Sequence, residues 1–262
     1  CAWATVAVVY MMVFANLHFL KKHPKVAEQN LLSDFEPIDK ATVLKTFKLG
    51  FPIGLSIIIE LSMFAGAGIM IAKLGSIETA AHAVAITIAS ASFMFYMGLG
   101  QGVTIRASQM LGADDPDAAR FSIKVGTILN VSLAAFIALM FVLFAEPLIR
   151  MASSDESVIE LAIVLLLFGA AFQIADSLQV AIIYALRAYN DTASPPKYQV
   201  LSFWVFGVPL GVGLAFFDWW PGLEGAKGMW TAMTASLYLV SLLLWYRLWQ
   251  MISNYQHEPE ST

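Results

Sequence analysis

The sequence contains little charge. Only 13% of its 262 residues are Asp, Glu, Lys or Arg, whereas 59% are hydrophobic. Because a soluble domain carries about a quarter charged residues, this composition excludes an ordinary water-soluble fold and predicts a helical membrane protein. The formal net charge of −4 is small and spread along the chain, so it indicates no nucleic-acid partner.

Cysteine and catalytic motifs are also scarce. The single cysteine, Cys1, excludes an internal disulfide framework and a thiolate metal site. The sequence contains no HExxH, GxSxG or Walker motif and no cluster of Cys and His. We therefore expect no enzyme activity and no cofactor. Any transport by this chain is expected to be driven by ions rather than by ATP.

Long apolar stretches without charge are abundant. They predict an all-α fold, a polytopic helical membrane bundle with about seven transmembrane helices. The expected spans are roughly residues 1–20, 46–72, 82–105, 125–145, 161–186, 198–217 and 228–246. The polar connection at 21–45 is either an interfacial amphipathic helix or a linker between two bundles. Gly207, Pro209, Gly211 and Gly213 predict a break in the sixth span.

The basic residues are concentrated in alternate loops. Of the 15 lysines and arginines, only Lys73, Arg150 and Lys227 lie outside four regions. These regions are the connection after the first span, the loop after the third, the loop after the fifth, and the C-terminal end. By the positive-inside rule, we expect these four regions, including the C-terminus, to be cytoplasmic.

One acid, Asp176, lies in the middle of the fifth span. No other charge occurs between Glu160 and Arg187, and a carboxylate at that depth costs about 3 kcal/mol on insertion scales. We therefore expect a partner that compensates for this cost. Gln173 and Gln179, three residues to either side, share the helix face of Asp176. They are expected either to contact a ligand or to form hydrogen bonds between helices.

The second span contains the other intramembrane acid, Glu60. At a rise of 1.5 Å per residue, Glu60 lies about 18 Å from Lys48, and Asp176 lies about 16 Å from Arg187. Two acids at matching depth predict one shared site. The alternative is that each is neutralised by a neighbouring helix and serves only packing. Pro52, two turns before Glu60, predicts a bend in this helix.

Several other side chains are candidates for a cavity or a ligand contact. The aromatic and Met cluster at residues 93–97 favours core packing, although such soft surfaces also suit promiscuous ligands. His82, near the outer end of its span, is expected at the membrane interface rather than at a metal. The candidate cavity-lining residues are Ser56, Asn130, Phe172, Gln173 and Gln179.

Three segments resemble one transporter family. FQIADSLQVAIIYALRAYNDTASPPK, residues 172–197, resembles the tenth helix and following loop of the multidrug and toxic compound extrusion (MATE) exporters, NorM-like branch. In that family a pattern like ALRGxxDTxxP ends the helix, and Ala188 stands here in place of the Gly. GFPIGLSIIIELSMF, residues 50–64, resembles the seventh helix, with Glu60 at its acid. GLGQGVTIRASQMLGA, residues 98–113, resembles the eighth helix and its loop.

The resemblance implies a particular domain organisation. MATE exporters have twelve helices in two lobes of six. This chain then looks like the last helix of the N-terminal lobe (1–20), a cytoplasmic inter-lobe connector (21–45), the six-helix C-terminal lobe (46–250) and a cytoplasmic tail (251–262). Because it begins with Cys and enters an apolar segment directly, we expect a fragment whose missing N-terminal lobe is a partner. The implied location is the bacterial cytoplasmic membrane.

The resemblance also implies a function. It is cation-coupled export of amphipathic, often cationic, organic compounds by alternating access. Glu60 and Asp176 match the acids that take the coupling cation, either Na⁺ or H⁺. The family often has a Tyr where Phe172 stands, so an oxygen contact is missing and the choice of ion stays open.

Two rival functions remain. A lipid-linked oligosaccharide flippase of related fold would need basic residues within the spans to bind a pyrophosphate, and the spans of this chain lack them. A non-transporting membrane bundle would show no ion-dependent change in stability or fluorescence.

Overall fold

The computed structural model describes residues 2–22 and 39–255, and these are helical almost throughout. The all-α prediction is therefore confirmed. The predicted connector at 21–45 and the tail lie largely outside the described residues. The elements are α1 (Ala2–Lys22), α3 (Lys40–Ala72), α4 (Ser76–Leu111), α5 (Pro116–Arg150), α6 (Glu156–Ala188), α7 (Ser194–Gln199), the π-helix η1 (Val200–Gly207), α8 (Val208–Phe216) and α9 (Ala226–Tyr255).

Six segments within the described residues are long and apolar enough to cross a bilayer. Five of them are α3, α4, α5, α6 and α9, and the sixth combines α7, η1 and α8. The first predicted span corresponds to α1, whose apolar part, Val6–Phe19, is shorter. The chain divides into two compact units, Cys1–Thr46 and Phe47–Thr262. All that follows concerns the second unit unless stated otherwise.

The helices extend beyond the predicted charge-free spans because capping residues start them in the polar loops. Asp115 accepts a hydrogen bond from the backbone N–H of Ala118, and Pro116 occupies the first turn of α5. Asp155 caps α6 in the same way through the N–H of Ser157. The cap positions, rather than the charge-free stretches, therefore set where α5 and α6 begin.

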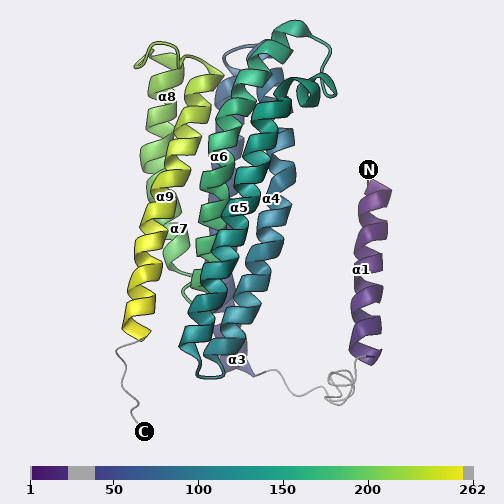
Figure 1. Ribbon diagram of the computed structural model, residues 1–262, viewed down its shortest axis with the longest axis vertical. Coiled ribbons are helices and arrows are strands. Elements are labelled where there is room, and N and C mark those ends of the chain that lie inside the picture. The colour runs from purple at the N-terminus through teal and green to yellow at the C-terminus, as the bar shows by residue number, and fades with distance from the viewer. Residues whose placement is uncertain (1, 23–38, 256–262) are drawn as a thin grey trace. The chain divides into compact units, whose positions relative to one another are not determined.

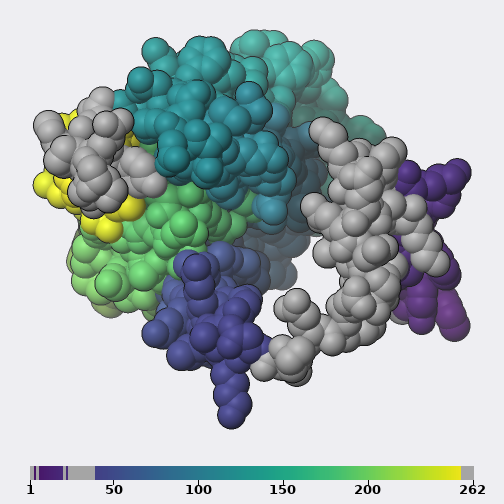
Figure 2. Space-filling model, turned by 90° about the horizontal axis from the view of Figure 1, so that it is seen from below, coloured from purple at the N-terminus to yellow at the C-terminus, as the bar shows by residue number. Residues whose placement is uncertain are grey.

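Helix α6 occupies the centre of the bundle and packs against α4, α5 and α9 (Figure 1). Two hydrophobic clusters lie along it. One, towards its N-terminal half, includes Leu165, Leu166 and Trp230, and the other includes Ile182 and Leu186. Helix α3 lies at the rim of this unit, next to the segment that contains α7, when the molecule is viewed from below (Figure 2).

The sixth span is irregular, as its glycines and proline predicted. Its middle part, η1, is a π-helix that ends at Gly207, two residues before Pro209. At Gly207 the backbone approaches α9 so closely that an added Cβ would lie 2.9 Å from Ser236 Oγ. A second irregularity, which the sequence analysis missed, occurs in α5. Phe144 leaves helical geometry (φ −123°, ψ 25°) three residues before Pro147.

The connections of this unit alternate between its two ends. The start of α3, the α4–α5 and α6–α7 loops and the end of α9 lie at one end (Figure 1), which we call the basic end. The α3–α4, α5–α6 and α8–α9 loops lie at the opposite end. The regions predicted to be cytoplasmic therefore share one end of the bundle.

Candidate cation and ligand site

A cavity of about 420 Å³ lies between α3, α4 and α6. Both intramembrane acids, Glu60 and Asp176, are among its lining residues. Most of the remaining wall is apolar. The lining residues, as the structure describes them, include no Lys, Arg or His. The other lining residues are Ile57, Leu61, Phe64, Ile86, Ala89, Ser90, Phe93, Met94, Met97 and Phe172.

Helical spacing places these side chains on the cavity. On α3, Ile57, Glu60, Leu61 and Phe64 follow the i, i+3, i+4, i+7 pattern of one helix face. On α6, Phe172 and Asp176 are one turn apart. The two acids therefore come from helices that are far apart in the sequence, and the cavity is where the faces that carry them meet.

Glu60 has one hydrogen-bond partner in the structure. Gln199 Nε2 donates to Glu60 Oε2 at 3.4 Å, while Glu60 Oε1 is buried and unpaired. Gln179 faces Glu60, but neither of its amide atoms has a well-formed hydrogen bond. The charges of Arg187 and Asp176 also act on this region. Glu60 thus retains an oxygen that can accept a proton or bind a cation.

Asp176 is more deeply buried than Glu60. It is 3% exposed, and its Oδ1 is buried without a hydrogen-bond partner. A buried carboxylate without a partner is costly, and the charge that acts on Asp176 in the described part of the chain is that of another acid, Glu60. Two acids on one cavity, both with an unpaired oxygen, form a site that a positive ion would stabilise.

Gln173 lies on α6 beside Asp176 but is not among the cavity-lining residues. It is fully buried and joins α6 to α4. Its Nε2 donates to the Ala89 carbonyl at 2.9 Å, and its Oε1 accepts from the Tyr96 hydroxyl at 3.0 Å. Of the two roles expected for this residue, the structure shows the hydrogen bond between helices.

Phe172 forms part of an aromatic wall. Its ring contacts Phe64 across the cavity (5.8 Å between centroids) and Trp230 behind it (5.9 Å). Trp230 Nε1 donates to His82 Nδ1 at 3.1 Å. The expected position of His82 at the membrane interface, near the outer end of its span, stays a prediction, but its side chain is only 8% exposed and therefore lies inside the bundle. The reason is that the indole N–H of Trp230 satisfies the imidazole inside the bundle.

The remaining candidates have different positions. Ser56 is buried and donates to Gln199 Oε1 at 2.5 Å. Asn130 is fully buried on α5, away from the cavity wall, and neither of its amide atoms has a partner. The cluster at residues 93–97 is divided: Tyr96 is fully buried, Phe95 is 63% exposed, and the other three members line the cavity. Core packing therefore describes Tyr96 and, in part, Phe93, which packs against the hydrophobic cluster that contains Tyr96.

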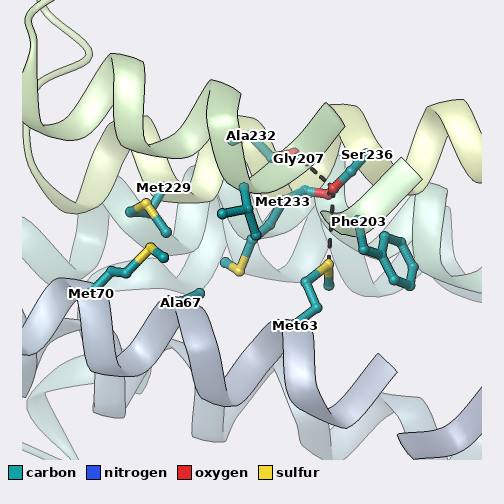
Figure 3. A pocket seen from close by; sticks show the side chains of 10 residues that line it. Met63, Ala67, Met70, Phe203, Gly207, Met229, Ala232, Met233 and Ser236 are labelled. Carbon is teal, nitrogen blue, oxygen red and sulfur yellow. Dashed lines mark hydrogen bonds between the residues drawn. The ribbon is translucent and has the colours of Figure 1, made fainter. Parts of the chain in front are cut away.

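A second pocket, of about 20 Å³, lies between α3, the junction of η1 and α8, and α9. Met63 and Met70 of α3 point towards Met229 and Met233 of α9 (Figure 3). Ser236 closes it and donates to the Ala232 carbonyl at 2.8 Å. The volume suits one water molecule at most. We therefore regard this methionine seam as adaptable packing between α3 and α9 rather than as a site for an organic ligand.

An ion pair at the basic end joins α9 to the loop between α6 and α7. Arg247 Nε of α9 donates to Asp191 Oδ2 at 2.6 Å, and Ser194 donates to the same carboxylate. Burial alone would raise the pKa of Asp191, but these hydrogen bonds outweigh burial and hold the pKa below its ordinary value of 3.8. Nearby, the Arg187 guanidinium lies 4.4 Å from the Tyr184 ring centroid.

Three residues around the site were not predicted from the sequence: Gln199, Phe64 and Trp230. Gln199 lies at the start of the predicted sixth span, and nothing in the local sequence predicts that its amide is fully buried. Phe64 lies one turn after Glu60, and that spacing was a usable signal. Trp230 carried no signal, since its contact with Phe172 joins residues 58 positions apart in the chain.

The chain is similar to known membrane transporters. A family model described as MatE matches residues 52–212. The probable multidrug resistance proteins NorM of Chromobacterium violaceum and Shewanella oneidensis are 35% and 36% identical over 248 residues, which is 95% of this chain and 53–54% of those proteins. The eukaryotic MATE transporter AtDTX14 aligns with a TM-score of 0.78 and 16% identity over 94% of this chain and 55% of its own.

These similarities concern only part of the relatives. This chain spans about half the length of the curated proteins that it matches. Similarity at 16% identity shows the fold alone. With six long apolar helices and these relatives, the chain is a multi-pass membrane protein.

Proposed function

This chain belongs to the MatE family, and from that premise we propose that it forms the C-terminal lobe of a cation-coupled multidrug efflux antiporter. The substrates would be amphipathic, often cationic, organic compounds, and the exchange would occur by alternating access. The observation that carries the proposal is the shared cavity with Glu60 and Asp176 on its wall. The printed names of the NorM relatives, multidrug resistance proteins, support it.

The cavity chemistry fits an amphipathic cation. Phe64, Phe93 and Phe172 offer aromatic faces, while Met94 and Met97 offer flexible thioethers. The two acids supply the only charges among the lining residues that the structure describes. A ligand with an apolar body and one positive group would bury the body against this wall and place its charge near a carboxylate.

Coupling follows from competition for the same negative charge. Two carboxylates on one cavity repel each other, and this repulsion falls when either acid takes a proton or when both share Na⁺. A coupling ion therefore lowers the affinity of the cavity for a cationic drug. Ion binding would drive export only if the ion binds more tightly to the conformation that releases the drug.

We further propose the membrane arrangement of the chain. The basic end of the bundle, with the C-terminus, would face the cytoplasm, and the membrane would be the bacterial inner membrane. Residues 1–20 would be the last helix of the N-terminal lobe, 21–45 the connector and 46–250 the C-terminal lobe. MatE transporters are not enzymes, and we assign no catalysis to this chain. Its partners would be the drug, the bilayer and an N-terminal lobe.

Two matched substitutions test the proposal. Glu60→Gln and Asp176→Asn keep the shape of the side chain and remove its charge. Each is expected to lower the rate of drug transport by about 100-fold or more, and so to abolish drug resistance. The measurement is ion-driven drug efflux from cells or liposomes with the full-length protein that contains this chain.

Gln173→Leu is the control for damage to α6, because Gln173 is buried on the same helix but its hydrogen bonds go to Tyr96 and Ala89 of α4. Equal expression of all three variants must be shown. Normal efflux by both acid variants would contradict the coupling role.

A further inference from the structure

Four methionine side chains meet at the seam between α3 and α9. Met63 and Met70 of α3 point towards Met229 and Met233 of α9 (Figure 3). Met63 is 5% exposed, and Met229 and Met233 are each 3% exposed. The pocket between these side chains, of about 20 Å³, has room for one water-sized particle. A ligand of this pocket must therefore be a single small species that thioether sulfurs can hold.

The pocket offers almost no donor atom besides sulfur. Of the ten described residues that line it, only Ser236 has an oxygen in its side chain. Hard cations such as Mg²⁺ and Ca²⁺ take about six or more oxygen ligands, which one hydroxyl cannot supply. Thioethers are soft ligands, and soft ligands select Cu(I). The pocket therefore differs in chemistry from the cavity that contains Glu60 and Asp176.

Helical spacing selects three of the four sulfurs. Met229 and Met233 are one turn apart, about 6 Å along α9, so both side chains can reach one ion. Met63 and Met70 are seven residues apart, about 10.5 Å along α3, which is too far for both to hold the same ion in straight reach. Met70 faces Met229, whereas Met63 lies beside Ser236, whose hydroxyl donates to its Sδ at 3.9 Å (Figure 3).

We propose that Met70, Met229 and Met233 form a binding site for a soft monovalent cation, Cu(I), for which Ag⁺ is the redox-inert analogue. Three neutral thioethers do not compensate the charge of the ion, and the cost of burying charge makes a monovalent ion a better fit than a divalent one. The bound ion would join the rim helix α3 to α9. The site is separate from the drug cavity and does not depend on the proposed function.

Small residues and an irregular helix surround these sulfurs. Ala67 and Ala232 line the pocket with side chains of one carbon. On α8, Gly211 lies so close to α9 that an added Cβ would be 2.9 Å from Met229 Sδ. Gly207, also on the wall, ends the π-helix η1, and π-helical turns frequently occur at functional sites. These small residues leave the space beside the thioethers free of branched side chains.

The test is equilibrium dialysis of the full-length protein that contains this chain against silver nitrate in chloride-free detergent buffer. Thiols are first blocked with N-ethylmaleimide, which leaves thioethers unchanged. Met70→Leu, Met229→Leu and Met233→Leu are each expected to weaken Ag⁺ binding by about ten-fold or more, since even the outer partners of metal ligands contribute about 10- to 100-fold. Leucine keeps the volume of methionine, so these variants are expected to fold.

The variant with all three substitutions is expected to retain one Ag⁺ fewer per protein than the unsubstituted protein. In the unsubstituted protein, Ag⁺ is also expected to raise the thermal midpoint more than in this variant, because an ion that binds the folded state stabilises it. An equal number of bound ions with equal affinity in the two proteins would overturn the proposal.

Two other methionines are the matched controls. Met151 is 87% exposed and lies outside the seam, whereas Met63 lines the same pocket. Met151→Leu and Met63→Leu are each expected to leave the affinity for Ag⁺ within about two-fold. A loss with Met63→Leu as large as that with Met70→Leu would overturn the choice of these three sulfurs. An equal loss with Met151→Leu would overturn the site itself.

X-ray absorption of the unsubstituted protein loaded with Cu(I) gives a test that needs no variant. The proposal expects a first shell that contains only sulfur, because the three thioethers supply all the ligands. A first shell of nitrogen or oxygen would place the ion elsewhere and overturn the proposal.

Discussion

Helices α3 and α6 have the same length but very different surroundings. Each has 33 residues, an apolar composition and one acid near its middle. On α6, 21 residues are buried, whereas on α3 only five are: Ser56, Ile59, Met63, Ala67 and Ile71. One wall of the cavity is therefore built into the core, and the other belongs to a helix at the rim.

The contacts that hold α3 explain how it differs. Its buried face meets the methionine seam of α9 and the amide of Gln199. Thioether side chains adapt to shifts of a packed helix more readily than branched ones, and no ion pair among the described residues involves α3. The comparison indicates that the position of Asp176 is set by the core, while the position of Glu60 depends on how α3 is placed.

The largest expected effect is the loss of stability when an isoleucine is truncated on α6, compared with the same change on α3. Ile182 on α6 is fully buried, and Ile69 on α3 is 66% exposed. Ile182→Ala is expected to lower the free energy of unfolding by about 2–5 kcal/mol, since it leaves a cavity in the core. Ile69→Ala is expected to change it by less than about 0.5 kcal/mol. Unfolding in mixed micelles measures the free energy of unfolding of both variants. An equal loss of stability would show that Ile69 is packed against a neighbour in the protein under test, although it is exposed in this unit.

A smaller effect is expected from paired glycines. A Cβ at Gly126 of α5 would lie 2.0 Å from Val103 Cγ2 on α4, whereas one at Gly54 of α3 would meet nothing within 4 Å. Val103 is stiff at χ1 and cannot move aside easily. Gly126→Ala should therefore cost about 1–3 kcal/mol of unfolding free energy, and Gly54→Ala close to zero. A costly Gly54→Ala would show that α3 has a close neighbour there in the full-length protein.

The smallest expected effect concerns the ion pair between Arg247 and Asp191. The folded-state pKa of Asp191 is lower than its ordinary value of 3.8, so the stabilisation is present at neutral pH and is lost as the pH falls through the folded pKa. Asp191→Asn is expected to cost about 1 kcal/mol at pH 7. The difference from the unsubstituted protein should begin to shrink as the pH falls below 3.8 and should close below the folded-state pKa. A difference that does not shrink as the pH falls would assign the effect to packing of the side chain instead of charge.

The sequence allowed prediction of most of the fold. Spans, their order and the break before Pro209 follow from local composition, because a bilayer requires about 20 apolar residues per helix and each helix satisfies its own backbone. It also singled out Glu60 and Asp176, since an acid in such a span is rare and visible without any partner. The helix ends were less predictable, because Asp115 and Asp155 extend their helices into polar loops.

The surroundings of the two acids were not predictable in this way. Gln173 and Gln179 occupy equivalent places on either side of Asp176 in the sequence, yet Gln173 is bonded to α4 while Gln179 is unpaired beside Glu60. The burial of His82 likewise depends on Trp230, whose indole N–H donates to its imidazole. Each of these outcomes depends on a residue far away in the chain, which periodicity cannot identify.

The sequence by itself determined that this chain crosses a membrane repeatedly and places two acids at similar depth, because both properties depend on residues counted along a single helix. Only the tertiary structure decided that the acids share one cavity, that α6 is its packed wall and α3 its rim, and that Gln199 contacts Glu60. The physical reason is that burial and hydrogen bonding arise between helices, and neighbouring helices are chosen by the packing of the whole bundle.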